Sequence, residues 1–191
     1  MALIPYPDLD KISPEAREML GRLPSPANIF NMMAHAETAL KPVMKLGGTL
    51  LGKLELDPKL RELCLLQAVK VGGGEYEWVQ HVPIALALGA TQPQIDALEK
   101  GDDRAACFDA TEQAALVFTR ELVSKGRASR EALAELRQHL SERVVVELII
   151  MAGFYQMLAR LTETLEVEND PPMGEALVRG IEARVKAKKQ A

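Results

Sequence analysis

Cysteine is scarce in this sequence, with only Cys64 and Cys107 among 191 residues. The two lie far apart in the chain. The N-terminus, MALIPYPDLD, has prolines and aspartates where a signal peptide needs a basic start and an apolar core. A structural disulfide is not expected, because such bonds belong mainly to exported proteins. We therefore expect a cytoplasmic protein with two reduced thiols.

The sequence also lacks a block of one charge and a hydrophobic run long enough for a membrane span. Its 23 basic and 27 acidic residues are mixed along the chain, apart from three lysines near the end, which argues against nucleic-acid binding. The most apolar stretch, residues 144–159, is interrupted by Glu147 and Gln156. It is shorter than the roughly 20 residues of a bilayer span. We expect a buried core helix there and no membrane partner.

No segment alternates polar and apolar residues between hairpin turns, as half-buried β-strands do. Capping residues and prolines in first turns instead predict helices along nearly the whole chain. The expected helices begin near Ser13, Ser25, Ala36, Asp57, Glu75, Thr91, Asp109, Ser129 and Ser141, and the last runs through Leu165. Pro42 is expected to break or kink its helix, and Pro83 is expected to kink its own. The predicted fold is all-α, a multi-helix bundle.

A single helical domain is expected over residues 1–168. The length of the chain and its 48% hydrophobic content are sufficient for one sizeable core. Residues 169–191 are expected to form a polar linker and a C-terminal helix with Leu177, Ile181 and Val185 on one face. That apolar face is narrow and needs a partner surface, either on its own domain or on a neighbouring subunit.

Two adjacent predicted helices carry ionisable side chains on apolar faces. At about 100° per residue, Glu77 and His81 share a face with Ala85, and Glu62 lies among leucines on the preceding helix. An unpaired buried polar group costs about 2 to 7 kcal/mol, so each of the three needs a partner. In a purely structural interpretation, Lys59 pairs with Glu62 at the surface and His81 is a satisfied core histidine.

The three groups together favour a site that moves protons. Two neighbouring carboxylates repel, so one keeps its proton to higher pH, and an imidazole beside them can relay that proton. We expect His81 to act as a general acid toward a carbanion or dienolate, Glu77 to orient it or deliver the proton, and Glu62 to set the charge state. Three further ring side chains are candidates to line the substrate pocket: Tyr76, Trp78 and His35.

A metal site is not expected from these residues. Glu77 and His81 are one helical turn apart and Glu62 is a third candidate, but only His35 remains as a fourth ligand, and no ligand motif repeats. The glycine triplet 72–74 follows no predicted strand and precedes no Lys-Ser/Thr pair, so it is interpreted as a turn rather than a phosphate site. The predicted partner is a small-molecule substrate, with no cofactor.

The spacing of Glu62, Gly74, Glu77 and His81 resembles the signature helices of the carboxymuconolactone decarboxylase/AhpD-like family. In the alkyl hydroperoxide reductase D branch, a glutamate is followed after eleven residues by Cys-x-x-Cys and, three residues later, by a histidine. Here Gly74 and Glu77 stand at the two cysteine positions. The run EYEWxxH is similar to that of a cysteine-poor group of members of uncharacterised activity, and the resemblance extends over about residues 8–168.

This resemblance implies an AhpD-like bundle that assembles as a homo-oligomer (dimer, trimer or hexamer) with the signature site close to a subunit interface. The decarboxylase branch implies a cofactor-free lyase that acts on a small carboxylated or lactone-type substrate. The alternative, an alkylhydroperoxidase or peroxiredoxin-type antioxidant protein, requires a thiolate that neither Gly74 nor Glu77 supplies. A third interpretation is a non-catalytic oligomeric scaffold in which the buried polar cluster only helps to define assembly.

Overall fold

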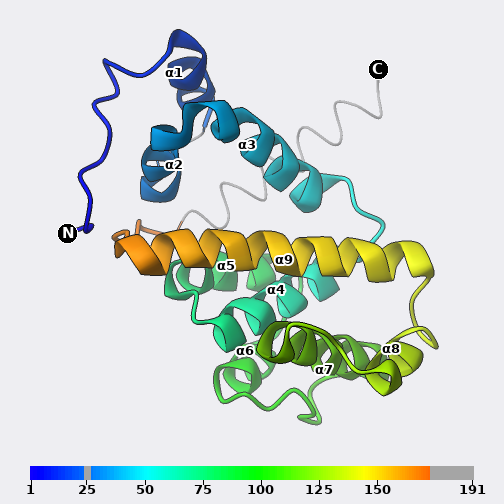
Figure 1. Cartoon of the computed structure of the whole chain (residues 1–191). Helices are drawn as coiled ribbons and strands as arrows, with labels where there is room; N and C mark the ends of the chain where they lie inside the picture. Colours follow the sequence, from blue (N-terminus) through cyan, green and yellow to red (C-terminus); the bar gives the residue numbers. More distant parts are fainter. Residues whose placement is uncertain (24–26, 173–191) are drawn as a thin grey trace.

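The computed structural model describes residues 1–23 and 27–172, and these residues form helices and connecting loops without strands. α9 crosses the middle of the molecule, with α1 to α3 on one side and α4 to α8 on the other (Figure 1). The helices are α1 (Pro14–Gly21), α2 (Asn28–Met33), the 3-10 helix η1 (Ala34–Ala36), α3 (Glu37–Gly52), α4 (Pro58–Gly72), α5 (Glu75–Ala87), α6 (Gln92–Glu99), α7 (Ala110–Lys125), α8 (Arg130–Leu136) and α9 (Glu142–Leu165). The all-helical prediction is thus confirmed for the described part of the chain.

Side-chain caps explain where most of these helices begin. The capping oxygen accepts a hydrogen bond from a backbone N–H three residues further on, at Ser13, Asp57, Asp109, Ser129 and Ser141. Capping boxes form before α6 and α7, where helices were expected to begin at Thr91 and Asp109. The predicted start at Ser25 lies outside the described residues, and α2 follows Ala27 without a side-chain cap.

Two prolines lie inside helices without ending them. α3 continues through Pro42 and α5 continues through Pro83. A proline removes one backbone donor from the ladder, yet both helices extend beyond it. A break at Pro42 is therefore wrong, since α3 is a single helix, and a kink at either proline stays a prediction.

α4 forms the centre of the core. It packs against α5, α7 and α9, and every residue from 60 to 69 is buried. Gly73 ends the helix in the left-handed region, at φ 78°, a conformation that glycine adopts without steric cost. α5 begins two residues later, so this short turn lays α4 and α5 side by side with Glu62 and His81 between them.

α9 is buried on one side only. By length and composition it is apolar enough to cross a membrane, and half of its most apolar window is buried inside the protein. Leu148, Met151 and Tyr155 face the core, whereas Val146 and Ile150 are exposed. The expected core helix is present, with a second, apolar face outside the core.

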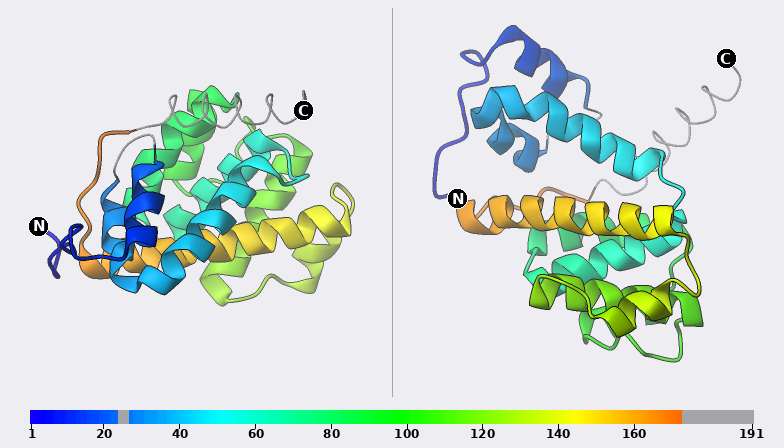
Figure 2. Two further views of the ribbon diagram at one scale, coloured as in Figure 1. Left: turned by 90° about the horizontal axis from the view of Figure 1, so that it is seen from above. Right: turned by 45° about the vertical axis from the view of Figure 1, so that its right-hand side comes forward.

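The segment that follows α9, residues 166–172, lies against the folded domain. Glu168 accepts hydrogen bonds from the hydroxyl of Tyr6 at 2.6 Å and the backbone N–H of Ala2 at 3.0 Å. Asp170 accepts from the backbone N–H of Asn28 at 2.7 Å and from the hydroxyl of Tyr76. The N-terminal segment accordingly lies beside the end of α9 and the segment that follows it in the left view of Figure 2. These residues pack as part of the domain, and the predicted C-terminal helix lies outside the described residues.

Candidate active site

The centre of the candidate site is a buried carboxylate and imidazole pair between α4 and α5. Oε2 of Glu62 lies 2.8 Å from Nδ1 of His81. Glu62 is wholly buried and His81 is 7% exposed. The two residues are 19 positions apart in sequence, and the glycine turn brings them together. The predicted proximity of Glu62 and His81 is therefore present in the structure.

Arg61 completes the pairing of Glu62 and was not among the predicted site residues. Its Nε and Nη2 lie 2.9 and 2.8 Å from Oε1 of Glu62, and its Nη1 donates to the carbonyl of Leu51 at 2.8 Å. Burial would raise the pKa of Glu62, but the charges and hydrogen bonds of His81 and Arg61 outweigh it and hold that pKa below its usual range. Glu62 is therefore ionised.

The surface ion pair proposed between Lys59 and Glu62 does not form. Nζ of Lys59 lies 2.8 Å from Oε1 of Glu112, at the start of α7. Lys59 and Glu62 are nearly one turn apart, but Glu62 faces α5 and α9 while Lys59 reaches toward α7. The structural interpretation of Glu62 as a surface ion pair is therefore wrong.

Aromatic packing holds the imidazole from the α9 side. The rings of His81 and Tyr155 meet edge to face, with centroids 4.9 Å apart and planes at 84°. Burial, together with the nearby charge of Glu62, raises the pKa of the Tyr155 phenol, so it stays protonated. An edge-to-face contact of this kind adds to the stabilisation that burial alone gives. Tyr155 is a second residue that helical periodicity alone marks only as core.

Glu77 lies one turn before His81 on α5, but its carboxylate points to a different partner. The hydroxyl of Thr162 on α9 lies 3.2 Å from both Oε1 and Oε2 of Glu77. Burial raises the pKa of Glu77 to about 7, although the hydrogen bonds and the charge of His81 act in the opposite direction. The site thus contains one ionised carboxylate, Glu62, and one that exchanges its proton near neutral pH. The sequence predicted that one of the two carboxylates would behave in this way because of their mutual repulsion, but the main cause at Glu77 is burial.

The second ring nitrogen of His81 differs from the first in its hydrogen bonding. Among the described residues, Nε2 of His81 has no hydrogen-bond partner. An ionised Glu62 selects the tautomer with the proton on Nδ1, which leaves a lone pair on Nε2. The arrangement can therefore accept a proton at Nε2 and donate it again from the same atom.

The three predicted pocket-lining residues lie in different places. The hydroxyl of Tyr76 is bonded to Asp170 and holds the segment after α9. Trp78 is half-buried, with Nζ of Lys70 5.4 Å from its ring centroid. His35 is exposed, and its Nε2 lies 2.8 Å from the carbonyl of Pro5. Of the three, Tyr76 and Trp78 share α5 with Glu77 and His81, and their role in substrate binding stays a prediction.

The position of the first family cysteine is closed by packing. A Cβ on Gly74 would come within 2.8 Å of the Ala159 Cβ and 2.9 Å of Oε2 of Glu77. A Cβ on Gly72 would meet the amide of Gln156, which is held by the carbonyl of Ala68 at 2.7 Å. Gly74 has a negative φ of −103°, so close approach rather than backbone conformation explains the glycine.

The two cysteines lie outside this cluster. Cys64 is wholly buried, and burial raises its pKa to about 12. Cys107 is half-buried in the loop between α6 and α7, with Sγ 3.6 Å from the carbonyl of Pro93. Both are free thiols. A thiol with a raised pKa is a poor nucleophile at neutral pH, because the thiolate is the reactive form.

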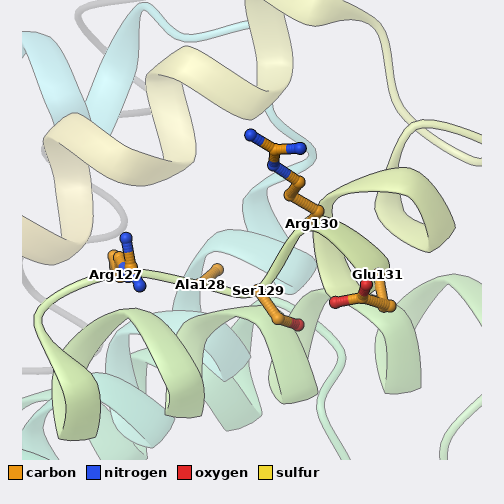
Figure 3. Close-up of a pocket in the computed structure, with 5 residues that line it drawn as sticks. All are labelled: Arg127, Ala128, Ser129, Arg130 and Glu131. Carbon is orange, nitrogen blue, oxygen red and sulfur yellow. The ribbon is translucent and has the colours of Figure 1, made fainter.

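Two further features of the described residues bear on ligands. No group of three or more His, Cys, Asp or Glu side chains in the described part of the chain is arranged to hold a metal ion. A pocket of about 310 Å³ lies at the α7 to α8 connection and is lined by residues 127–131 (Figure 3). Ser129 in this pocket caps α8, and its backbone N–H donates to Glu121. The pocket is formed by the α7 to α8 loop and the first two residues of α8, and it includes none of the paired site residues.

Comparison with known proteins gives a family and a fold. The model of the carboxymuconolactone decarboxylase family matches residues 37–121, which include Glu62, Glu77 and His81. No curated protein matches the sequence significantly.

Several solved structures have a similar fold at low sequence identity. One is the core of an AhpD-type alkylhydroperoxidase, an uncharacterised peroxidase-related protein from Ralstonia eutropha JMP134, with 15% identity over 88% of this chain and 92% of that chain and a TM-score of 0.76. Another, from Agrobacterium tumefaciens, is described as a putative antioxidant defence protein AhpD, with 19% identity over 73% and 96% of the two chains and a TM-score of 0.67. A third is a variant of the debrominase Bmp8 in complex with 2,3,4-tribromopyrrole, with 16% identity over 94% and 97% and a TM-score of 0.72.

These likenesses show a shared fold and not a shared activity. They agree with the resemblance that the signature spacing predicts, and the family model covers both signature helices. The family-model match over residues 37–121 and the shared fold support assignment of this chain to the carboxymuconolactone decarboxylase/AhpD-like family.

Proposed function

We propose that this protein is a cofactor-free acid/base enzyme of the decarboxylase type, which acts on a small carboxylated or lactone-type substrate. The observation that carries the proposal is the buried Glu62 and His81 pair, with Nδ1 of His81 held and Nε2 without a hydrogen-bond partner in the described part of the chain. A core histidine that served only packing would need neither a buried carboxylate nor an arginine to hold that carboxylate.

In the proposed mechanism, Glu62 is a positioning residue and His81 moves the proton. Glu62 holds the imidazole in one tautomer and stabilises the imidazolium, as carboxylates do in other carboxylate–histidine pairs. When the substrate carboxylate leaves as carbon dioxide, its bonding electrons pass into the conjugated lactone or carbonyl. The protonated Nε2 of His81 then donates its proton to the carbon of the resulting dienolate.

Glu77 is the proposed source of the replacement proton. Its pKa of about 7 means that it is neither fully protonated nor fully ionised at neutral pH, the range in which an acid or base group is most effective. The neighbouring i, i+4 position on α5 suits transfer to His81 through substrate or water. Thr162 orients the carboxyl group from α9.

The proposed substrate class draws on the family and on the chemistry of the site. The family model takes its name from decarboxylation of a carboxylated lactone. Such a reaction requires proton transfer to carbon and no electron transfer, which the carboxylates and imidazole here can support.

The peroxidase alternative has weaker support from the residues of this chain. The solved AhpD-type structures share the fold, but the cysteine positions of the signature carry Gly74 and Glu77, and Cys64 is buried with a raised pKa. Thiol peroxidase chemistry needs an accessible thiolate and a partner thiol. The debrominase comparison likewise supports the fold alone.

The test is turnover of a panel of small carboxylated butenolide lactones. Turnover is measured as carbon dioxide release and as loss of the absorbance of the conjugated system. The wild-type protein should turn over at least one member, and His81→Ala should lose about 10²- to 10⁴-fold of that rate. His139→Ala is the matched control, because His139 lies between Glu135 and Thr111 outside the cluster and its loss should leave the rate unchanged. Equal rates for wild type and His81→Ala would contradict the proposed role.

The same panel separates the enzyme from a scaffold. Under the scaffold interpretation, His81→Ala changes the thermal unfolding or the assembly of the protein, and no substrate is turned over by any variant. Circular dichroism and analytical ultracentrifugation on the same preparations give that comparison.

A further inference from the structure

We infer that the exposed face of α9 is a self-association surface, on which the α9 helices of two copies of this chain pack antiparallel about a two-fold axis at the level of residue 151. Four large apolar side chains form this face, which we call the α9 row: Val146, Ile149, Ile150 and Met157, each 40 to 54% exposed. The inference stands independently of the proposed catalytic function.

The α9 row is a continuous stripe rather than scattered exposed residues. At about 100° per residue, its members fall within roughly 100° of one another around the helix and extend over about 17 Å of its length. Single exposed apolar residues are common on protein surfaces, whereas a stripe of this size on one helix indicates a surface that another surface covers. α9 bears this stripe along its central turns, outside the core that its other face builds.

Gly153 lies in the middle of the stripe, and nothing within the described part of one chain explains it. It is exposed, and a Cβ added there would meet no atom within 4 Å. Glycine in the interior of a helix is less favourable than alanine because it loses more backbone freedom on folding. A glycine at the centre of an apolar face does allow a bulky side chain from another helix to approach closely.

The charges at the two ends of the stripe select a second copy in antiparallel orientation. Glu142 and Arg160 are 18 residues apart, which is five full turns, so they lie on the same line at opposite ends of the α9 row. Both are exposed. In an antiparallel pair, Glu142 of each copy meets Arg160 of the other, whereas a parallel pair would set like charges together.

The contacts that Glu142 and Arg160 make within one chain leave room for this pairing. Glu142 is bonded to Arg137 at 2.6 Å through one oxygen, and Arg160 donates through Nη2 to the carbonyl of Gly72 and to Gln156. A guanidinium has five N–H donors and a carboxylate has two acceptor oxygens. Each group therefore retains capacity for a partner across the axis.

One register satisfies both the charges and the packing. The midpoint between Glu142 and Arg160 is residue 151, and so is the midpoint between Ile149 and Gly153. A two-fold axis at that level therefore pairs the end charges and also places Ile149 of each copy against Gly153 of the other. Isologous contacts of this kind are the commonest form of self-association in soluble proteins.

The first experiment measures assembly by analytical ultracentrifugation over a range of protein concentrations. The wild-type protein should form a dimer or an even-numbered assembly, and Ile149→Asp should raise the dissociation constant of the α9 contact about tenfold or more. Leu133→Asp on α8 is the matched control, since Leu133 is 37% exposed and lies away from the row. A wild-type monomer, an odd-numbered assembly, or equal dissociation constants for wild type and Ile149→Asp would overturn the inference.

Charge reversal tests the antiparallel orientation. Glu142→Arg and Arg160→Glu should each weaken association, and the double variant should restore it to within about threefold of wild type. Two weak single variants with an equally weak double variant would contradict the proposed pairing.

A cross-link tests the register. In a Cys107→Ser background, an equal mixture of Ile149→Cys and Gly153→Cys chains should give a disulfide-linked pair under mild oxidation, and neither chain alone should do so to the same extent. Equal cross-linking of the single chains would contradict the register. If wild type is monomeric and instead sediments with phospholipid vesicles, the occupant of the α9 row is a membrane and the inference fails.

Discussion

At the scale of single residues, Glu77 should make the stability of the protein depend on pH. Burial raises its pKa to about 7 in the folded state, against about 4.5 in the unfolded chain. Between those values the folded protein holds a proton that the unfolded chain has lost, so stability falls as the pH rises from about 4.5 to 7. This pKa difference corresponds to about 3 kcal/mol as an upper value.

The measurement is urea unfolding at pH 5, 6, 7 and 8 for wild type and Glu77→Gln. The free energy of unfolding of the wild type should decline relative to the variant by about 1 to 3 kcal/mol across this range. Glu131→Gln is the control, because Glu131 is exposed on α8. Parallel pH profiles for wild type and Glu77→Gln would show that folding does not raise the pKa of this carboxyl group.

Glu62 should be more important for stability than an exposed glutamate that also forms an ion pair. Glu62→Gln leaves the buried Arg61 guanidinium without its carboxylate and should lower the free energy of unfolding by about 3 kcal/mol. Glu55→Gln removes an exposed pair with Arg143 and should cost less than about 1 kcal/mol. Thermal and urea unfolding of both variants at pH 7 make the comparison. Similar losses would mean that the Arg61 and Glu62 pair is solvated in solution.

The cysteines allow a direct test of the peroxidase alternative. Hydroperoxide consumption with a dithiol reductant should be negligible for wild type and equal in the Cys64→Ser, Cys107→Ser double variant, because burial raises the pKa of Cys64 to about 12 and Cys107 has no partner thiol in the signature positions. A wild-type rate that the double variant loses would restore the thiol mechanism and reject the acid/base one.

At the scale of elements, replacing glycine by alanine should have opposite effects on stability at two places. It should destabilise the turn between α4 and α5 and stabilise the exposed side of α3. Gly74→Ala places a Cβ 2.8 Å from that of Ala159 and should lower the free energy of unfolding by about 1 to 3 kcal/mol. Gly48→Ala on α3 meets nothing within 4 Å and should raise it by about 0.5 to 1 kcal/mol, because alanine favours the helix. Urea unfolding measures both.

The sign of the change in the free energy of unfolding in Gly74→Ala shows whether the turn has room for a side chain. A stabilising Gly74→Ala would mean that α9 does not press on this turn, and the position would then have space for the thiol of the family signature. A destabilising one supports the view that this chain lacks both the cysteine and the room for it.

Helix starts and the pairing of Glu62 with His81 differ in why they were predictable. A capping side chain bonds a backbone group three residues away. The helix starts at Asp57 and Ser141 can therefore be predicted from the neighbouring sequence alone. The Glu62 and His81 pair depends on two helices and one glycine turn. The sequence predicted that these residues cluster with Glu77, but it assigned the orienting of His81 to Glu77, whereas Glu62 is the carboxylate that bonds the imidazole.

Arg61 was missed for a physical reason. Neighbouring residues on a helix point about 100° apart, so adjacent charges are not expected to pair. The long arginine side chain nevertheless reaches around α4 to Glu62 and ties both to the end of α3 through the Leu51 carbonyl. Thr162 was missed because its partner, Glu77, is 85 residues away. Periodicity marks both positions as buried without naming what they meet.

At the scale of the whole molecule, the segment 166–172 joins parts that the sequence pattern could not connect. Polar composition and two prolines predicted a linker beginning near residue 169. The contacts that hold the segment link Asp170 to Asn28 and Tyr76, which are 142 and 94 residues away. Such pairings leave no periodic signal, because each involves one side chain and a distant group.

Asp170 should therefore link the N-terminal helices to α5, because its carboxylate accepts a hydrogen bond from each. Asp170→Ala removes the acceptor for the Asn28 N–H and the Tyr76 hydroxyl, and should lower the free energy of unfolding by about 1 to 3 kcal/mol. Tyr76→Phe should cost less, because it removes only one of the two hydrogen bonds.

The Asp170→Ala, Tyr76→Phe double variant shows whether the two residues stabilise the protein through the same hydrogen bond or independently. If Asp170 and Tyr76 act through the same bond, the Tyr76→Phe change should cost little once Asp170 is alanine, so the combined loss is smaller than the sum. Hydrogen exchange at the Asn28 amide should quicken in Asp170→Ala and stay near the wild-type rate in Tyr76→Phe. Thr164→Ala, an exposed change nearby on α9, is the control. Strictly additive losses with unchanged exchange at Asn28 would mean that this segment is a linker after all, and that the N-terminal helices are held by apolar packing alone.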